Sequence, residues 1–361
     1  MKMQENPFNP YFGKRPDIFI GRSEIKREFL NALNQPNSPW RSTIVTGVRG
    51  TGKTVLLSET SESLPKSAIV LSVSAEPGFL DNILAQLYNQ LNSLQQAKRT
   101  ISSLNLSVNE NGLTMSKQTP AFLNTFRNQL TTLMGAFNHE KLFVFLIDEV
   151  QKHTDEMRTF VSTFQHLVRE NYNLALLVAG LPQALSDLLN DEVLTFFRRS
   201  NQIVLQNVEI ALVQLDYHDV FFPMALDDET IGAAAEASLG YPYLIQLIGF
   251  YIWESLTRGG ENQILERALI RSKSDLFRNV HDIIFSELSS GDRQFIFAMA
   301  EDEMTSRRSA IEKRLEKDRS YVSTYRARLI AAGVIQASGY GELRFTIPYM
   351  REYLLQKMKE L

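Results

Sequence analysis

Eight residues, Gly47 to Thr54, have the types and spacing of a phosphate-binding loop. They read Gly-Val-Arg-Gly-Thr-Gly-Lys-Thr and satisfy the pattern G-x-x-x-x-G-K-[ST]. Glycines let a backbone turn so tightly that successive N–H groups can point at phosphates, and a following helix adds its dipole. We expect Lys53 to neutralise the β- and γ-phosphates of ATP and the Thr54 hydroxyl to ligate Mg²⁺. The other nucleotide contacts expected from this segment are Gly47, Val48, Arg49, Gly50, Thr51, Gly52 and Val55.

Two carboxylates, Asp148 and Glu149, directly follow the apolar run 143–147. A parallel strand that ends here would bring both acids to the same edge of the sheet as the glycine loop. Asp148 would then hold the Mg²⁺ shell, and Glu149 would orient and polarise the attacking water. The alternative is that the two acids cap and begin a helix.

The elements that must position these groups alternate along the chain. Short apolar runs alternate with amphipathic helical patterns, which is typical of a parallel sheet covered on both faces. The runs are 42–46, 68–72, 142–147, 174–179 and 203–205. We therefore predict an α/β fold of the P-loop NTPase type over residues 21–208, preceded by an extended arm at 1–20. A β-hairpin insertion is expected at about 100–117, where apolar segments flank Asn-Glu-Asn-Gly at 109–112.

The strand signal stops near residue 209. Residues 209–288 have only helical patterns and are expected to form a helical lid domain. Three short helices at 289–301, 306–316 and 320–332 then precede two strands at 334–337 and 343–347. This order predicts a winged-helix domain at 289–361, although small helical domains with a terminal hairpin also serve other purposes.

Composition narrows the class of protein. The chain has 361 residues, a formal net charge of -3 and no cysteine. A net acidic chain does not coat nucleic acid over its whole surface, so any contact must be local. Without cysteine, disulfides, zinc fingers and thiol chemistry are excluded. No apolar run reaches the ~18 residues that span a bilayer, and the N-terminus lacks a signal-peptide core. We expect a soluble, cytoplasmic protein without a membrane partner.

With both nucleotide motifs, the chain resembles the AAA+ ATPases of the bacterial and archaeal origin-recognition type, and less closely the STAND signalling ATPases. The resemblance begins at Asn6-Pro7-Phe8 and Ile20-Gly21-Arg22 and extends to the C-terminal domain. It implies ATP hydrolysis, with the segment around Ile20 bordering the adenine.

The resemblance also implies positions where this chain departs from its relatives. Gly180 stands where they place a polar sensor, and Tyr243 stands where many carry a lid arginine that reaches the nucleotide. Arg198 and Arg199 match the box of the arginine finger, which acts across a subunit interface. That match implies a nucleotide-dependent homo-oligomer. The alternative is two solvated arginines in a loop.

The C-terminal domain raises the question of nucleic acid. Residues 289–361 contain thirteen Lys and Arg against ten Asp and Glu, a small excess in an acidic protein. Side chains expected to reach duplex DNA are Arg319, Tyr321, Ser323, Arg326 and Arg344. We therefore expect nucleotide state to control assembly and DNA association. The alternative is a STAND-type signalling switch whose C-terminal domain docks a protein.

Overall fold

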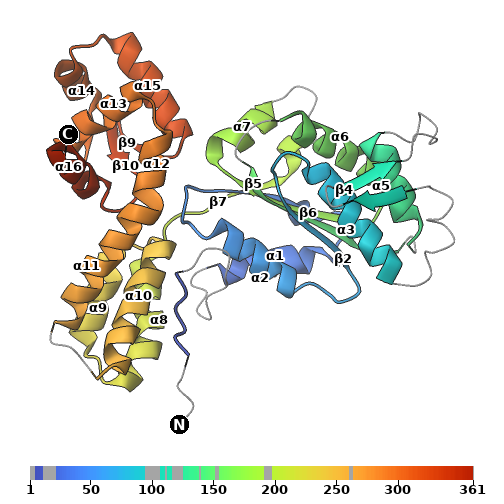
Figure 1. The fold of residues 1–361 in the computed structure, drawn as a ribbon, viewed down its shortest axis with the longest axis horizontal. Helices are drawn as coiled ribbons and strands as arrows, with labels where there is room; N and C mark the ends of the chain where they lie inside the picture. Colours follow the sequence, from blue (N-terminus) through green and yellow to red (C-terminus); the bar gives the residue numbers. More distant parts are fainter. Residues whose placement is uncertain are drawn as a thin grey trace. The chain divides into compact units, whose positions relative to one another are not determined.

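The computed structural model describes residues 5–10, 22–93, 106–109, 112–115, 125–137, 140–150, 154–190, 197–259 and 263–360 (Figure 1). The chain forms two compact units. The sheet unit comprises Glu24–Thr46 and Leu56–Val204. The helical unit comprises Met1–Ser23, Gly47–Val55 and Leu205–Leu361. The glycine loop, Gly47–Val55, therefore belongs to the helical unit although it connects two elements of the sheet unit.

A five-stranded, all-parallel sheet organises the sheet unit, with strand order β2-β5-β6-β1-β7. The strands are β1 (Ser42–Thr46), β2 (Ile69–Ser74), β5 (Phe143–Val150), β6 (Leu174–Gly180) and β7 (Asn201–Val204). These strands confirm the predicted fold class. β7 begins two residues before the predicted run of 203–205. The apolar pattern missed these two residues because they are polar, as an edge strand allows.

Helices cover both faces of this sheet. They are α1 (Ser23–Ala32), α2 (Lys53–Glu62), α3 (Phe79–Ser93), α5 (Phe126–Gly135), α6 (Asp155–Arg169) and α7 (Pro182–Asn190), with short turns η1 (Pro39–Arg41) and η4 (Phe197–Arg199). Figure 1 shows α1 and α2 on one face and α6 and α7 on the other. Side chains alternate along β5, so Phe145 and Ile147 join a buried cluster with α3, α5 and α6, whereas the equally buried Leu146 does not.

The expected insertion contains a two-stranded hairpin. Its strands β3 (Leu106–Asn109) and β4 (Gly112–Met115) are antiparallel, and Asn109 lies opposite Gly112. The remaining residues assigned to this insertion lie outside the described ranges.

The helical unit begins with the predicted lid helices and a docked N-terminal segment. The lid comprises α8 (Ile210–Phe221), η5 (Phe222–Met224), α9 (Asp228–Ala237), α10 (Pro242–Thr257) and α11 (Ile264–Leu276). Phe8 of the N-terminal segment is 1% exposed and packs its ring on Tyr217 and Phe221 of α8. Gly249 of α10 makes room for that ring, since an added Cβ would lie 2.4 Å from it.

A continuous helix joins the lid to the C-terminal domain. After α11 it makes one π-helical turn, η6 (Phe277–His281), and continues as α12 (Asp282–Glu287). The C-terminal elements are α13 (Ser290–Ala300), β8 (Ser306–Arg307), α14 (Arg308–Leu315), α15 (Arg319–Ala331), β9 (Ile335–Gly339), β10 (Glu342–Phe345) and α16 (Met350–Glu360). Their small antiparallel sheet has the order β8-β10-β9.

Two features of the C-terminal domain differ from the sequence expectation. Ser306 and Arg307, expected to begin a helix, form the edge strand β8, because Ser306 pairs with Leu343 and its buried hydroxyl donates to the Met299 carbonyl (3.0 Å). In addition, α16 follows the hairpin and packs on the joining helix.

One hydrophobic core runs from the lid into the C-terminal domain and includes Leu276, Val280 and Tyr353. His281 is buried at the same junction, with its ring nitrogens 3.1 and 3.0 Å from the carbonyl oxygens of Leu276 and Pro348. Burial lowers the pKa of His281 to about 4, so the ring is neutral at pH 7. None of the helices formed by the described residues is both long and apolar enough to cross a lipid bilayer.

Candidate nucleotide-binding site

The glycine loop leaves the end of β1 and leads into α2. Gly50 and Gly52 have φ of 75° and 85°, a region that favours glycine. An added Cβ at Gly47 would lie 2.5 Å from the Thr51 hydroxyl, which donates to the Val48 carbonyl at 2.8 Å. The loop therefore makes a tight turn. Side chains at its glycines would prevent this backbone conformation.

Lys53 and Thr54 are the first two residues of helix α2. The Lys53 ammonium donates to the carbonyl oxygens of Gly47 and Val48, each at 2.8 Å, which holds the cation over the loop. Thr54 is exposed in the first turn. The positive end of the α2 dipole and the Lys53 charge therefore act at the same place, which suits a phosphate group.

Two tyrosines of the lid hold the loop from the other side. The buried Tyr241 hydroxyl donates to the Arg49 carbonyl at 2.6 Å, and the Tyr243 backbone N–H donates to the Gly50 carbonyl at 3.3 Å. Burial raises the pKa of Tyr241, so its hydroxyl remains a donor at neutral pH. An added Cβ at Gly50 would lie 2.1 Å from that hydroxyl. The lid thus determines the path of the loop backbone.

Tyr243 does not present its side chain as the predicted nucleotide contact would require. Its side chain is 8% exposed within the lid core, and its hydroxyl accepts a hydrogen bond from Asn279 at 3.0 Å. Its backbone N–H is the group that donates to the loop. The residue that sequence reasoning missed is its neighbour Tyr241, because nothing in the spacing links position 241 to Arg49.

In the sheet unit, Asp148 and Glu149 lie in the last part of β5. Asp148 pairs with Ser74 of β2 and accepts a hydrogen bond from the Glu149 N–H at 2.8 Å. Glu149 is exposed and has a φ of 57°, a left-handed conformation that costs free energy in a residue other than glycine. The helix-capping alternative is wrong, because α6 begins later, with Thr154 as its N-cap.

The strained Glu149 accompanies a change of strand register. Pairing of β5 with β6 shifts after Ile147, and Val150 then pairs with Gly180, which also pairs with Thr46 of β1. The ends of three neighbouring strands therefore meet at one edge of the sheet, and the glycine loop begins at the residue after Thr46.

The same register explains the missing sensor at Gly180. An added Cβ there would lie 2.4 Å from the Val150 carbonyl oxygen and 2.8 Å from its Cβ. A polar side chain at this position would collide with the backbone of β5. The packing of this sheet therefore leaves room for glycine alone at position 180.

The structure separates the two arginines proposed as a finger. Both lie in η4 and are exposed, but Arg198 donates to the carbonyl oxygens of Leu189 and Asn190, at the C-terminal end of α7. That geometry is a helix C-cap. Arg199 has no hydrogen-bond or ion-pair partner among the described residues. Within the described ranges, Arg199 therefore differs from Arg198 in having no such partner.

The oxygen donors of Thr54 and Asp148 suit a Mg²⁺ ion bound together with a nucleotide better than a metal ion bound by protein side chains alone. The described ranges contain no cluster of three or more His, Asp or Glu side chains that could hold a metal. Thr54 and Asp148 supply two oxygen donors, and Mg²⁺ commonly takes one or two protein oxygens together with phosphate oxygens and water. These residues therefore fit MgATP. Ile20, expected near the adenine, lies outside the described residues.

The candidate DNA residues lie on α15 and β10. Arg319 and Ser323 are exposed on α15, and Arg326 follows at the helical spacing that continues the same face. The Tyr321 ring packs on Tyr325 at 4.4 Å between centroids. Arg344 is exposed on β10. By contrast, Arg328 forms an ion pair with the buried Asp292 at 2.9 Å, so its role is structural.

Comparison with known proteins agrees with this geometry. Residues 18–178 match the family model of the AAA ATPase domain, and residues 278–354 match a domain of unknown function, DUF8462. No curated protein matches the chain in sequence. The sheet unit therefore has the P-loop NTPase fold and is similar to an AAA ATPase domain.

Two solved structures resemble nearly the whole chain. The Walker-type ATPase PABY2304 of Pyrococcus abyssi aligns with a TM-score of 0.67 and 17% identity, covering 94% of this chain and 97% of that one. The ADP form of the ORC2 protein of Aeropyrum pernix aligns with a TM-score of 0.52 and 15% identity, covering 97% of both chains. At these identities the likeness shows a shared fold.

Proposed function

We propose that this protein binds MgATP and hydrolyses it, and that its nucleotide state controls its assembly and its association with DNA. The observation that supports nucleotide binding most strongly is the glycine loop itself. Its backbone is closed around Gly50 and Gly52, and Lys53 stands above it at the start of α2. The ADP-bound form of the similar ORC2 structure supports the same proposal.

Each residue has a distinct part in the proposed reaction. Lys53 and the loop N–H groups bind the β- and γ-phosphates, while Thr54 and Asp148 hold Mg²⁺. When bound, Mg²⁺ neutralises phosphate charge. Glu149 orients and polarises the attacking water, and its left-handed backbone is a strain that sheet packing maintains at a working residue. Arg199 supplies positive charge to the phosphates of a neighbouring subunit.

DNA association is assigned to the C-terminal domain. Its order of helix, strand, two helices and two strands supports the proposal of a winged helix, in which α15 would be the recognition helix. Most basic side chains here have local partners, such as Arg314 with Asp302 at 2.6 Å. Arg319 and Arg326 have no ion pair with any described residue. They share one face of α15 with Ser323, where they can meet phosphates.

The direct test changes Arg319, Arg326 and Arg344 together to alanine and measures duplex DNA affinity against salt concentration. Each lost phosphate contact lowers the slope of log affinity against log salt by roughly one, so we expect a drop of about three. A control variant removes the same number of charges from the sheet unit, at Arg27, Lys66 and Arg169, and should keep the wild-type slope.

Two outcomes separate the parts of the proposal. If titration calorimetry detects no MgATP binding by the wild-type protein, the nucleotide assignment fails. If ATP binds but the wild-type protein with ATP binds no duplex even at low salt, the DNA assignment fails alone. The C-terminal domain would then be a protein-docking module, as in a STAND-type switch.

A further inference from the structure

The glycine loop contacts the C-terminal part of the helical unit as well as the lid. The Arg49 guanidinium donates to both carboxylate oxygens of Glu287, at 2.8 and 3.0 Å. Glu287 is the last residue of α12. The two side chains are 31% and 56% exposed, so the pair is partly solvated and can exchange partners.

Val48, the residue before Arg49, lies against the turn that follows α15, the helix with most of the candidate DNA residues. It packs against the hydrophobic core of the helical unit, and Gly333 lies opposite it. An added Cβ at Gly333 would lie 3.0 Å from the Val48 side chain. Gly333 lies in the turn directly after α15, where its N–H donates to the Ile330 carbonyl at 2.9 Å and its φ is 70°. Two consecutive loop residues thus contact the last residue of α12 and the turn that follows α15.

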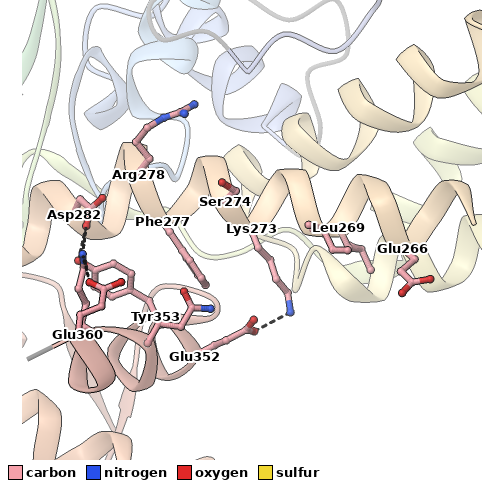
Figure 2. Close-up of a pocket in the computed structure, with 13 residues that line it drawn as sticks. Glu266, Leu269, Lys273, Ser274, Phe277, Arg278, Asp282, Glu352, Tyr353 and Glu360 are labelled. Atoms are coloured by element: carbon pink, nitrogen blue, oxygen red, sulfur yellow. Dashed lines mark hydrogen bonds and ion pairs between the residues drawn. The ribbon is translucent and has the colours of Figure 1, made fainter.

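Two side-chain contacts connect the helix that ends at Glu287 to α16. Lys273 of α11 pairs with Glu352 of α16 at 2.8 Å, and the Tyr353 hydroxyl donates to Asp282 of α12 at 2.7 Å. Figure 2 shows Lys273 and Glu352 facing each other across the groove between the two helices. Glu287 therefore ends a helix whose earlier residues are held to α16.

We propose that the Arg49–Glu287 pair is a nucleotide-sensitive latch between the phosphate-binding loop and the C-terminal domain. The proposal rests on the loop binding ATP, as proposed above. A triphosphate on the loop brings several negative charges to the residues next to Arg49. They attract the guanidinium and repel the Glu287 carboxylate, over a range that screening limits to ~10 Å. Both effects weaken the pair, so ATP releases the C-terminal domain from the loop, and MgADP does so less.

Linkage makes the latch measurable without DNA. If ATP weakens the pair, then weakening the pair by mutation must strengthen ATP binding by the same factor. Exposed ion pairs of this kind correspond to roughly two- to fivefold in an equilibrium constant. We expect Glu287→Gln to raise MgATP affinity about two- to fivefold in titration calorimetry, and Glu287→Arg to raise it further at low salt. A residue with a merely structural role would lower affinity or leave it unchanged.

Glu352→Gln is the matched control, because it removes one negative charge and one ion pair from the same unit without touching the loop. Its ATP affinity should equal that of the wild-type protein. Hydrogen exchange supplies a second readout. MgATP should increase exchange in the wild-type segments around residues 287 and 333, and this increase should be absent in Glu287→Arg, where the pair is already broken.

The outcomes are distinguishable from failure of the proposed function. If the wild-type protein binds no ATP, both proposals fall together. If it binds ATP but Glu287→Gln has unchanged or weaker affinity, or if ATP leaves exchange at these segments unchanged or lowers it, the latch is refuted and the ATPase proposal stands. Equal gains in Glu287→Gln and Glu352→Gln would also refute it, since charge alone would then explain the effect.

Discussion

The glycine loop and the acidic end of β5 are proposed to act on the same nucleotide, yet they are held in opposite ways. The conformation of Asp148 and Glu149 comes from the register of neighbouring strands within one sheet. The loop is held by residues far along the chain, including Tyr241 of the lid and Glu287 of α12. Binding should therefore respond to changes throughout the helical unit, whereas turnover should respond to changes at the sheet edge.

The largest effect should come from the loop cation. Lys53→Ala removes the charge that the carbonyl oxygens of Gly47 and Val48 hold in place, so we expect MgATP affinity to fall by about 100-fold or more, or ~2.7 kcal/mol. Calorimetry measures it, with Lys66→Ala as a surface control. Near-normal affinity in Lys53→Ala would remove the loop from the nucleotide site.

Glu149→Gln tests the acidic end of β5, where we expect a change to affect turnover and not nucleotide binding. The amide keeps the shape of the side chain but polarises water less, so we expect turnover to drop roughly 10²-fold while ATP affinity is retained. Steady-state hydrolysis and calorimetry on the same preparation separate the two. Unchanged turnover would mean that Glu149 has no part in the reaction despite its strained backbone.

Arg198 and Arg199 are neighbours in η4, so substitutions at the two positions can be compared directly. Arg199→Ala should lower turnover about tenfold or more with normal ATP affinity, because a finger acts on transition-state charge. Arg198→Ala should instead lower the free energy of unfolding by about 1 kcal/mol, since it removes the cap on α7. Mixing Arg199→Ala with Glu149→Gln should restore some activity. A mixture that stays inactive, with the protein monomeric in ATP, would argue against a finger.

The smallest predicted effect tests whether the lid truly holds the loop. Tyr241→Phe and Tyr217→Phe each remove a buried hydroxyl that donates to a backbone carbonyl at 2.6 Å, to Arg49 and to Ile245 respectively. Both should lower the free energy of unfolding by about 1–2 kcal/mol. Only Tyr241→Phe should also weaken MgATP binding, by about fivefold. Equal affinities in the two variants would show that the loop keeps its path without the lid.

Much of the fold was readable from the sequence because it depends on local pattern. The strands β5 and β6 begin with continuous apolar runs, and β1, which has two apolar residues at its buried centre, has the predicted bounds. The edge strands β7 and β8 were harder to predict. They contain polar residues, and their pairing depends on a strand that is distant in the sequence.

The candidate site shows a similar division. Lys53, Thr54 and Asp148 follow from motif spacing, since each is defined by its place at the end of a strand or the start of a helix. The left-handed backbone of Glu149, the C-cap made by Arg198 and the hold of Tyr241 on the loop do not. Each depends on a carbonyl oxygen or a strand register that only the folded chain brings near.

The continuous helix from α11 to α12 has a consequence for how such proteins can be recombined. The match to DUF8462 begins at residue 278, inside the π turn, and not at the loop near residue 289 where the secondary structure changes. The core explains this, because Phe277 and His281 pack their rings on Tyr353 of α16. A chimera joined at residue 289 would separate these rings, whereas one joined before residue 277 would carry them together. A module that keeps this core intact must therefore include the last turns of the lid helix.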